Sequence, residues 1–199
     1  MSYSGESMQG VPHGMGTYTF NDNEYYEGAW GNGRFHGSGK YVFASGNIYE
    51  GSWAEGNMNG NGKWISKNGD IYVGEFVNGN KNGKGMLSFR LVCLFNCSFF
   101  DSSQTLYRNY SEGDSYDGDW VDGERTGNGL MKYFNSTTNT TDTYTGEFLT
   151  GDMHGKGRYV FSNGNTYDGD WEHNMMQGHA NWSSHSGDTY EGEYVSGKR

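Results

Sequence analysis

Hydrophobic and polar residues alternate along most of the chain, and the alternation restarts at a fixed interval. In the segment that begins at Tyr26, glycine and aromatic residues at positions 26, 28 and 30 alternate with Glu27 and Ala29. A period of two predicts a β-strand with aromatic side chains on one face and polar side chains on the other. A second alternation over residues 37–43 again places glycine and aromatic residues on one face. Each such unit therefore predicts two strands that form one β-hairpin.

Turn residues separate the predicted strands. Residues 31–37 are rich in glycine and asparagine, which tolerate positive φ, and we interpret the whole segment as one turn. Ser45-Gly46-Asn47 forms the next turn, and Asn-Gly at 68–69 and at 163–164 is the strongest short-range signal for a hairpin. Glycine at this density breaks helices. The predicted fold is all-β, an elongated single-layer antiparallel β-meander of about eight hairpins.

The hairpin recurs eight times. Its first tyrosine stands at positions 3, 26, 49, 72, 116, 144, 167 and 190, so five of the seven steps are 23 residues and the other two are 28 and 44. A fixed period of this length indicates a stacked repeat architecture, which usually offers a long surface rather than a pocket. We therefore divide the chain into repeats 1–4 (residues 1–89), an insertion (residues 90–112) and repeats 5–8 (residues 113–199), the last of them partial.

Composition indicates what fills the core. The chain of 199 residues has 34 glycines, one proline and 17% aromatic residues. We expect tyrosine and tryptophan rings to lie over the bare glycine backbone of neighbouring strands. On the opposite face, acidic residues of the first strands and basic residues of the second strands are expected to pair across the ladder and to fix its register.

Charge and cysteine usage narrow the function classes. The net charge is −10, whereas binding to nucleic acid or to an anionic membrane needs basic patches. Cys93 and Cys97 both lie in the insertion, and their spacing fits no common zinc motif. The first residues lack the basic and apolar regions of a secretory signal, and no apolar run approaches the roughly 20 residues of a membrane span. We expect a cytoplasmic protein.

The chain offers no catalytic or metal-binding pattern. His13, His36 and His154 share a repeat position that elsewhere holds Asn59, Asn82, Thr126 and Gln177, which favours a role in the turn over a chemical one. The acidic residues do not form a calcium loop with a distal glutamate. Glycine pairs lie within strands rather than before helices, so they do not indicate phosphate binding. We expect neither an enzyme nor a cofactor or metal.

The aromatic face is the candidate site. One interpretation is that its rings form only the core; the other is that the same face also binds another protein, since tryptophan and tyrosine dominate binding hot spots. A single-layer sheet leaves such a face partly exposed. The candidate partner-binding residues are Tyr26, Trp30, Tyr41, Tyr49, Trp53, Trp64, Tyr72, Phe76, Tyr116, Trp120, Tyr144, Phe148, Tyr159, Tyr167, Trp171 and Tyr190.

The segments Tyr26 to Phe43 (YEGAWGNGRFHGSGKYVF) and Tyr144 to Phe161 (YTGEFLTGDMHGKGRYVF) carry a family resemblance. Their pattern and period resemble the MORN (membrane occupation and recognition nexus) repeat, and the resemblance covers nearly the whole chain. It implies an antiparallel β-meander without catalysis of its own. It also implies a protein-binding scaffold or adaptor in a cytoskeletal or ciliary assembly, since MORN arrays occur in radial-spoke head and other axonemal proteins.

Two other functions stay open. The family's name suggests a peripheral membrane module that binds phosphoinositides, although the negative charge disfavours it. The third is a regulatory subunit of a separately encoded enzyme. In this sequence Asn174 replaces a turn glycine, and the last repeat ends after its first strand. Open edges near Tyr3 and Gly197 could pair with a partner or form a homodimer.

The insertion contains the one long apolar run, residues 91–100. It is interpreted as a loop folded over the sheet, as a partner-docking loop, or as the product of a retained intron. We expect residues 91–110 to be the least ordered part of the chain or to pack against the aromatic face. The polar segment 135–142 is expected to extend a loop.

Overall fold

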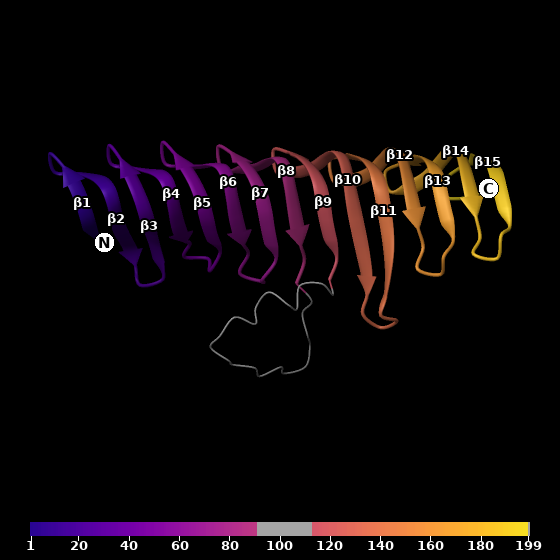
Figure 1. Cartoon of the computed structure of the whole chain (residues 1–199), viewed down its shortest axis with the longest axis horizontal. Helices are drawn as coiled ribbons and strands as arrows, with labels where there is room; N and C mark the ends of the chain where they lie inside the picture. The colour runs from indigo at the N-terminus through magenta and orange to yellow at the C-terminus, as the bar shows by residue number, and fades with distance from the viewer. Residues whose placement is uncertain (91–112, 199) are drawn as a thin grey trace. The chain divides into compact units, whose positions relative to one another are not determined.

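The computed structural model describes residues 1–90 and 113–198. In these residues it contains fifteen β-strands and no helix, and the strands follow one another in chain order in one antiparallel sheet (Figure 1). The all-β meander predicted from the sequence is confirmed. The strands are β1 (Ser2–Met8), β2 (Val11–Asn21), β3 (Glu24–Gly31), β4 (Arg34–Val42), β5 (Ile48–Ala54), β6 (Asn57–Ile65), β7 (Ile71–Val77), β8 (Asn80–Ser88), β9 (Ser115–Val121), β10 (Glu124–Asn135), β11 (Thr140–Leu149), β12 (Asp152–Val160), β13 (Thr166–Glu172), β14 (Met175–Ser183) and β15 (Thr189–Tyr194).

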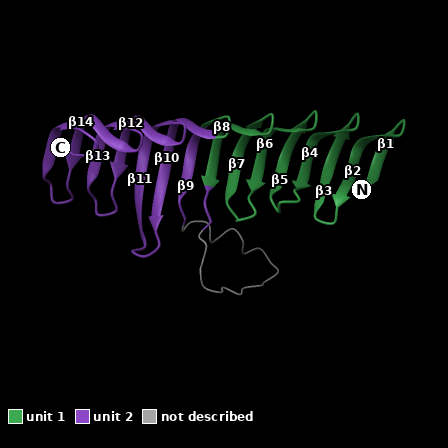
Figure 2. Ribbon diagram, turned by 180° about the vertical axis from the view of Figure 1, so that it is seen from behind, with its two compact units in different colours: residues 1–87, 120–123 green, residues 88–119, 124–199 purple. Residues whose placement is uncertain are grey.

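The strands belong to two compact units (Figure 2). Unit 1 comprises Met1–Leu87 and Trp120–Gly123, and unit 2 comprises Ser88–Asp119 and Glu124–Arg199. No helix in the described part of the chain has the length and apolar character needed to cross a membrane. Each unit repeats the same hairpin, so one repeat explains how both are built.

The first turn of each hairpin is shorter than the sequence suggests. Asn32 (φ 51°) and Gly33 (φ 78°) form a tight turn, and β4 already begins at Arg34. The interpretation of residues 31–37 as one turn is therefore wrong. Asn174 (φ 64°) takes the corresponding backbone conformation without glycine, and its side-chain amide is held by Asp152 Oδ1 at 2.6 Å.

A β-bulge absorbs the extra residues of the second strand. Gly28 pairs with Gly39 and Trp30 pairs with Phe35, so residues 36–38 of β4 lie opposite Ala29 alone. Equivalent register shifts occur in the hairpins β5–β6, β11–β12 and β13–β14. Bulges bend the strand that carries them. The bend brings Phe35 onto the ring of Tyr26, with the two centroids 3.9 Å apart.

In most repeats the second turn is wider, and backbone hydrogen bonds close it. The amide of Phe43 donates to the carbonyl of Asn47 at 2.9 Å, and the predicted turn at 45–47 is confirmed. The amide of Phe89 makes the same bond to Asp114 at 2.9 Å, so the described residues that flank the insertion are paired like those of an ordinary wide turn. The expectations for residues 91–110, Cys93 and Cys97 lie outside the described residues.

The core consists of tyrosine rings on glycine backbone, as the composition predicts. The ring of Tyr49 covers Gly51 and Gly62, and a Cβ atom added at Gly51 would meet the Cα of Gly62 at 2.5 Å. Six first-position tyrosines are completely buried, with 0% of their surface exposed: Tyr26, Tyr49, Tyr72, Tyr116, Tyr144 and Tyr167. The glycines in these strands are therefore required by close approach rather than by flexibility.

Candidate interaction face

Most of the candidate residues form a tightly packed inner row. In unit 1, Tyr49 contacts Trp53 and Phe76 edge to face, with centroid distances of 5.1 and 5.0 Å. In unit 2, Tyr144 contacts Phe148 and Trp171 in the same way at 5.1 and 5.2 Å. Edge-to-face pairs stabilise beyond the area that they bury. The buried candidates are Tyr26, Trp30, Tyr49, Trp53, Tyr72, Phe76, Tyr116, Trp120, Tyr144, Phe148, Tyr167 and Trp171.

The polar atoms of the inner row are satisfied by backbone carbonyls. The hydroxyl of Tyr49 donates to the carbonyl of Ser52 at 2.9 Å, and the indole N–H of Trp53 donates to Gly39 at 3.0 Å. Burial raises the pKa of Tyr49 to about 12. These bonds tie each ring to the bulge of its own repeat or to the preceding repeat, so the inner row is a structural element.

A second row of rings is half-exposed and lies toward the wide turns. We call it the outer aromatic row. In unit 1, the centroid distances between successive rings are 4.6, 5.6, 4.4 and 5.2 Å along Tyr18, Phe20, Tyr41, Phe43 and Trp64. In unit 2 the row contains Tyr133, Tyr159, Phe161 and Trp182, all of them half-exposed.

The outer aromatic row includes three of the predicted partner-binding residues and six that the sequence did not single out. The predicted three are Tyr41, Trp64 and Tyr159. Tyr190 takes the inner-row position of the last repeat, where it is half-exposed and pairs with Trp182. The six missed are Tyr18, Phe20, Tyr133, Phe43, Phe161 and Trp182. A signal for some of them was present, because Phe43 follows Tyr41, and Phe161 follows Tyr159, at the two-residue spacing of one strand face. Partner binding by any of these rings remains a prediction.

Two tyrosines of the outer aromatic row are bound to carboxylates. The hydroxyl of Tyr41 donates to Glu24 Oε1 at 2.9 Å, and that of Tyr159 donates to Asp142 Oδ2 at 3.0 Å. Burial, with the hydrogen bond and charge of Glu24, raises the pKa of Tyr41 to about 12. Burial and Asp142 likewise raise the pKa of Tyr159. The face thus combines exposed ring surface with negative charge.

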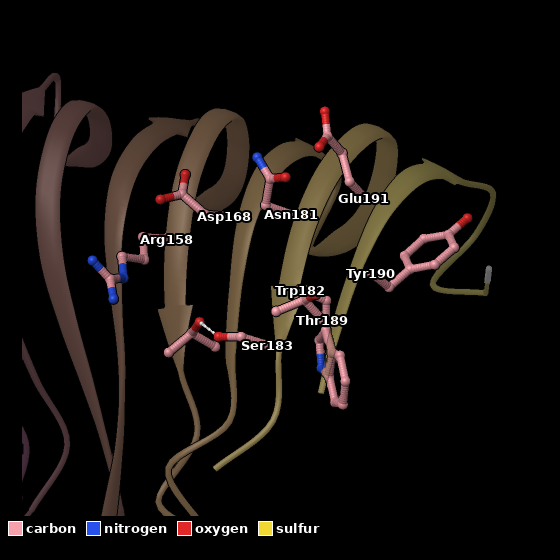
Figure 3. Close-up of a pocket in the computed structure, with 9 residues that line it drawn as sticks. Arg158, Asp168, Asn181, Trp182, Ser183, Thr189, Tyr190 and Glu191 are labelled. Carbon is pink, nitrogen blue, oxygen red and sulfur yellow. Dashed lines mark hydrogen bonds between the residues drawn. The ribbon is translucent and has the colours of Figure 1, made fainter. Parts of the chain in front are cut away.

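The opposite face carries the predicted charge ladder. Lys40 lies between Glu27 and Glu50 in register, and Lys156 Nζ lies 2.6 Å from Asp170 Oδ1. Near the end of unit 2, a shallow depression of about 300 Å³ is lined by side chains that include Arg158 and Asp168 (Figure 3). Trp182 and Tyr190 also line it, so this open depression combines charged groups, hydroxyls and some apolar surface.

The histidine position has a backbone role. His36 and His154 lie in the bulges of β4 and β12, and their carbonyls are second, longer acceptors for the hydroxyls of Tyr26 and Tyr144, at 3.5 and 3.3 Å. The carbonyl of Gln177 does the same for Tyr167 at 3.3 Å. Because the backbone makes the contact, different side chains can stand there. In the described residues, no group of three His, Cys, Asp or Glu side chains could hold a metal ion.

The hairpin unit, the bulge and the tyrosine–glycine packing define a β-hairpin repeat protein. The MORN repeat family model matches residues 3–25, 26–48, 49–71, 72–90, 116–138, 144–166, 167–189 and 190–199. The chain therefore belongs to the MORN repeat family. MORN repeats are generally modules for interaction with proteins or membranes, and the repeat itself is non-enzymatic.

Other comparisons add little to the family assignment. No curated protein matches the chain. Among solved structures, it is similar to the SAS-4 (dCPAP) TCP domain of Drosophila melanogaster, solved in complex with a proline-rich motif of Ana2 (dSTIL). The TM-score is 0.45 with 8% sequence identity, over 91% of this chain and 85% of that chain.

Proposed function

We propose that this MORN protein is a non-enzymatic scaffold or adaptor that binds an extended or helical segment of another protein along the outer aromatic row. The observation that carries the proposal is a row of half-exposed rings backed by a fully packed inner row. In unit 1, Phe43 contacts Tyr41 and Trp64 but keeps part of its ring surface open. Contiguous exposed aromatic surface usually marks an interaction site.

The packing below the row favours recognition of a partner with little rearrangement. Tyr41 lies 6.1 Å from the buried Trp53, and Tyr159 lies 5.9 Å from the buried Trp171, so both exposed rings rest on the core. A preorganised aromatic surface loses little conformational entropy on binding. The proposed location is the cytoplasm, within a cytoskeletal or ciliary assembly, and this part of the proposal follows from the family alone.

The test is affinity capture of the tagged protein from its own cells at physiological salt, followed by mass spectrometry. The matched pair of variants is Phe43→Ser with Phe161→Ser, against Val42→Ser with Val160→Ser. Each control residue is the neighbour of a test residue and is also half-exposed, but it belongs to the opposite face. We expect a stoichiometric protein partner that the phenylalanine variant loses and the valine variant keeps.

Two results would contradict the proposal. Recovery of the protein alone, or with membrane lipid only, would remove the scaffold function and favour the membrane alternative. Equal recovery of the partner by both variants would place binding on another surface. Circular dichroism and thermal unfolding of both variants show whether any loss comes from unfolding instead.

A further inference from the structure

Two places on the outer aromatic row combine ring surface with a carboxylate. We infer that Tyr41 with Glu24, and Tyr159 with Asp142, are subsites for cations, at which Lys or Arg side chains of a basic protein segment dock. The inference rests on the proposed function, because it specifies the chemistry of the segment that the outer aromatic row binds.

The subsite in unit 1 has a carboxylate held only by neutral donors. Glu24 Oε1 accepts from the Tyr41 hydroxyl at 2.9 Å, and Oε2 accepts from Asn21 Nδ2 at 3.0 Å. The ring of Phe43 lies 4.4 Å from that of Tyr41 and is tilted by 36°. A guanidinium or ammonium group between ring and carboxylate would gain both a cation–π contact and a charge-assisted hydrogen bond.

The subsite in unit 2 repeats this arrangement. Asp142 Oδ1 accepts from the amide of Ser162 at 2.7 Å, and Oδ2 accepts from the Tyr159 hydroxyl at 3.0 Å. Phe161 lies 4.6 Å from Tyr159, and Tyr133 lies 6.1 Å from it on a nearly parallel plane. The same three groups, a tyrosine, a phenylalanine and a carboxylate, thus meet in both units.

No cation among the described residues neutralises either carboxylate. Neither Glu24 nor Asp142 forms an ion pair in the described residues. Arg125 of unit 2 is engaged elsewhere: its guanidinium lies over the ring of Phe148 and donates to the carbonyl of Gly151 at 2.6 Å. With a net charge of −10, the protein attracts a basic segment over a longer range as well.

The residue next to the outer ring is a carboxylate in some repeats and a neutral amide in others. Where the ring at the position of Tyr41 is a tryptophan, as at Trp64 and Trp182, the residue at the position of Glu24 is an asparagine, Asn47 or Asn165. In unit 1, a charged subsite is therefore followed one repeat later by the neutral ring of Trp64. Two strands advance about 10 Å. The matching segment carries a basic and an apolar residue separated by about three positions if it is extended, or about seven if it is helical.

The test is selection from a displayed library of random peptides on the purified protein at physiological salt. We expect selected peptides to combine Lys or Arg with apolar residues. The test variant is Glu24→Gln with Asp142→Asn, and the control variant is Glu27→Gln with Asp168→Asn. Both remove the same charge, but the control carboxylates are exposed on the opposite face. We expect the test variant to bind selected peptides about two- to fivefold more weakly, and the control to be nearly unchanged.

The outcomes separate the inference from the proposed function. If selected peptides have no basic excess, or if both variants weaken binding equally, the cation subsites are excluded while docking on the aromatic row stands. If no peptide is selected and capture from cells also yields no partner, both fail together. Because asparagine already occupies the equivalent position in two repeats, the substitutions are compatible with the fold.

Discussion

Tyr26 donates a hydrogen bond from its phenol to the backbone carbonyl of Ala29, three residues further along the same strand, at 2.7 Å. Ala29 lies opposite the bulge of β4, where the regular ladder is interrupted. The tyrosine thus supplies a donor to a carbonyl at the position where the strand bends. The same bond spans three residues from Tyr72 to Glu75 and from Tyr144 to Glu147, at 3.0 and 2.9 Å. The tyrosine is therefore needed for its hydroxyl as well as for its ring.

Removal of one such hydroxyl should destabilise the protein although the ring stays in place. Tyr49→Phe leaves the carbonyl of Ser52 without this donor, and we expect a loss of about 1–2 kcal/mol in the free energy of unfolding. Tyr190→Phe is the control, because the hydroxyl of Tyr190 makes the equivalent bond to Glu193 at an exposed position. Urea denaturation measures both. An equal loss in the two variants would show that burial of the hydrogen bond does not determine its contribution to stability.

The two glycines of a repeat should differ in their tolerance of alanine. A Cβ atom at Gly51 would meet backbone, the Cα of Gly62 at 2.5 Å and the carbonyl oxygen of Asn61 at 2.7 Å. At Gly62 it would meet the ring of Tyr49, and in the corresponding place of another repeat Ala180 already stands. We expect Gly51→Ala to cost about 2–3 kcal/mol and Gly62→Ala clearly less. Thermal unfolding distinguishes them, and the reverse order would contradict this account of the packing.

An acid placed opposite the bulge should stabilise a repeat that lacks one. Glu75 Oε1 accepts from the amide of Lys84, and Glu147 Oε1 from that of Lys156, both at 3.0 Å. The equivalent residues in the second repeat are Ala29 and Ser38. We expect Ala29→Glu to raise the free energy of unfolding by about 0.5–1.5 kcal/mol. Ala29→Met is the control of similar length without an acceptor, and an equal gain from it would point to apolar contact instead.

Stability should fall at alkaline pH. Burial raises the pKa of Tyr26, Tyr49 and Tyr72 from 10.0 to about 12. Above pH 10 the unfolded chain loses these protons while the folded protein keeps them. Ionisation therefore lowers the free energy of the unfolded state and leaves that of the folded state unchanged. The stabilisation is complete below pH 10 and is lost as the pH rises through 12. Denaturant midpoints across this range, with tyrosinate absorbance as a second signal, measure the effect; a constant midpoint would contradict it.

The sequence predicts the hairpins well because their signals are local. Asn-Gly pairs, the two-residue alternation and the tyrosine period each act within one repeat, and the strands and wide turns follow them. The bulge was missed because residues 34–37 read as turn by local preference. The aromatic residue Phe35 within this segment indicated a strand. The equivalent positions of other repeats hold Met58, Lys81 and Arg125, which range from apolar to charged and so show no common pattern.

The candidate site was predicted only in part, for a reason of packing. Alternation assigns Tyr26 and Tyr41 to the same face of the sheet, and register places them opposite each other. Yet Tyr26 is enclosed by Trp30 and Trp53, whereas Tyr41 keeps exposed surface. This difference depends on the bend at the bulge and on packing against the next repeat. The residue pattern within one repeat contains neither.

The two turn edges of the hairpins differ in how far they can be altered. At the tight-turn edge, the amide of Gly56 donates to the carbonyl of Phe35 in the preceding repeat at 3.0 Å, and that of Gly151 donates to Arg125 at 2.9 Å. At the wide-turn edge, a backbone bond such as that between Phe43 and Asn47 stays within one repeat. The links between repeats come from side chains there: Asn47 Oδ1 accepts from the amide of Lys67 at 2.8 Å. The longer loop between β10 and β11 lies at this edge too (Figure 1).

Loop closure costs little more as a loop lengthens. The wide-turn edge is therefore where such an array can acquire new sequence during evolution without giving up its repeat, and both departures from the 23-residue period occur there. For protein engineering, the same edge is the natural position for an inserted epitope or domain.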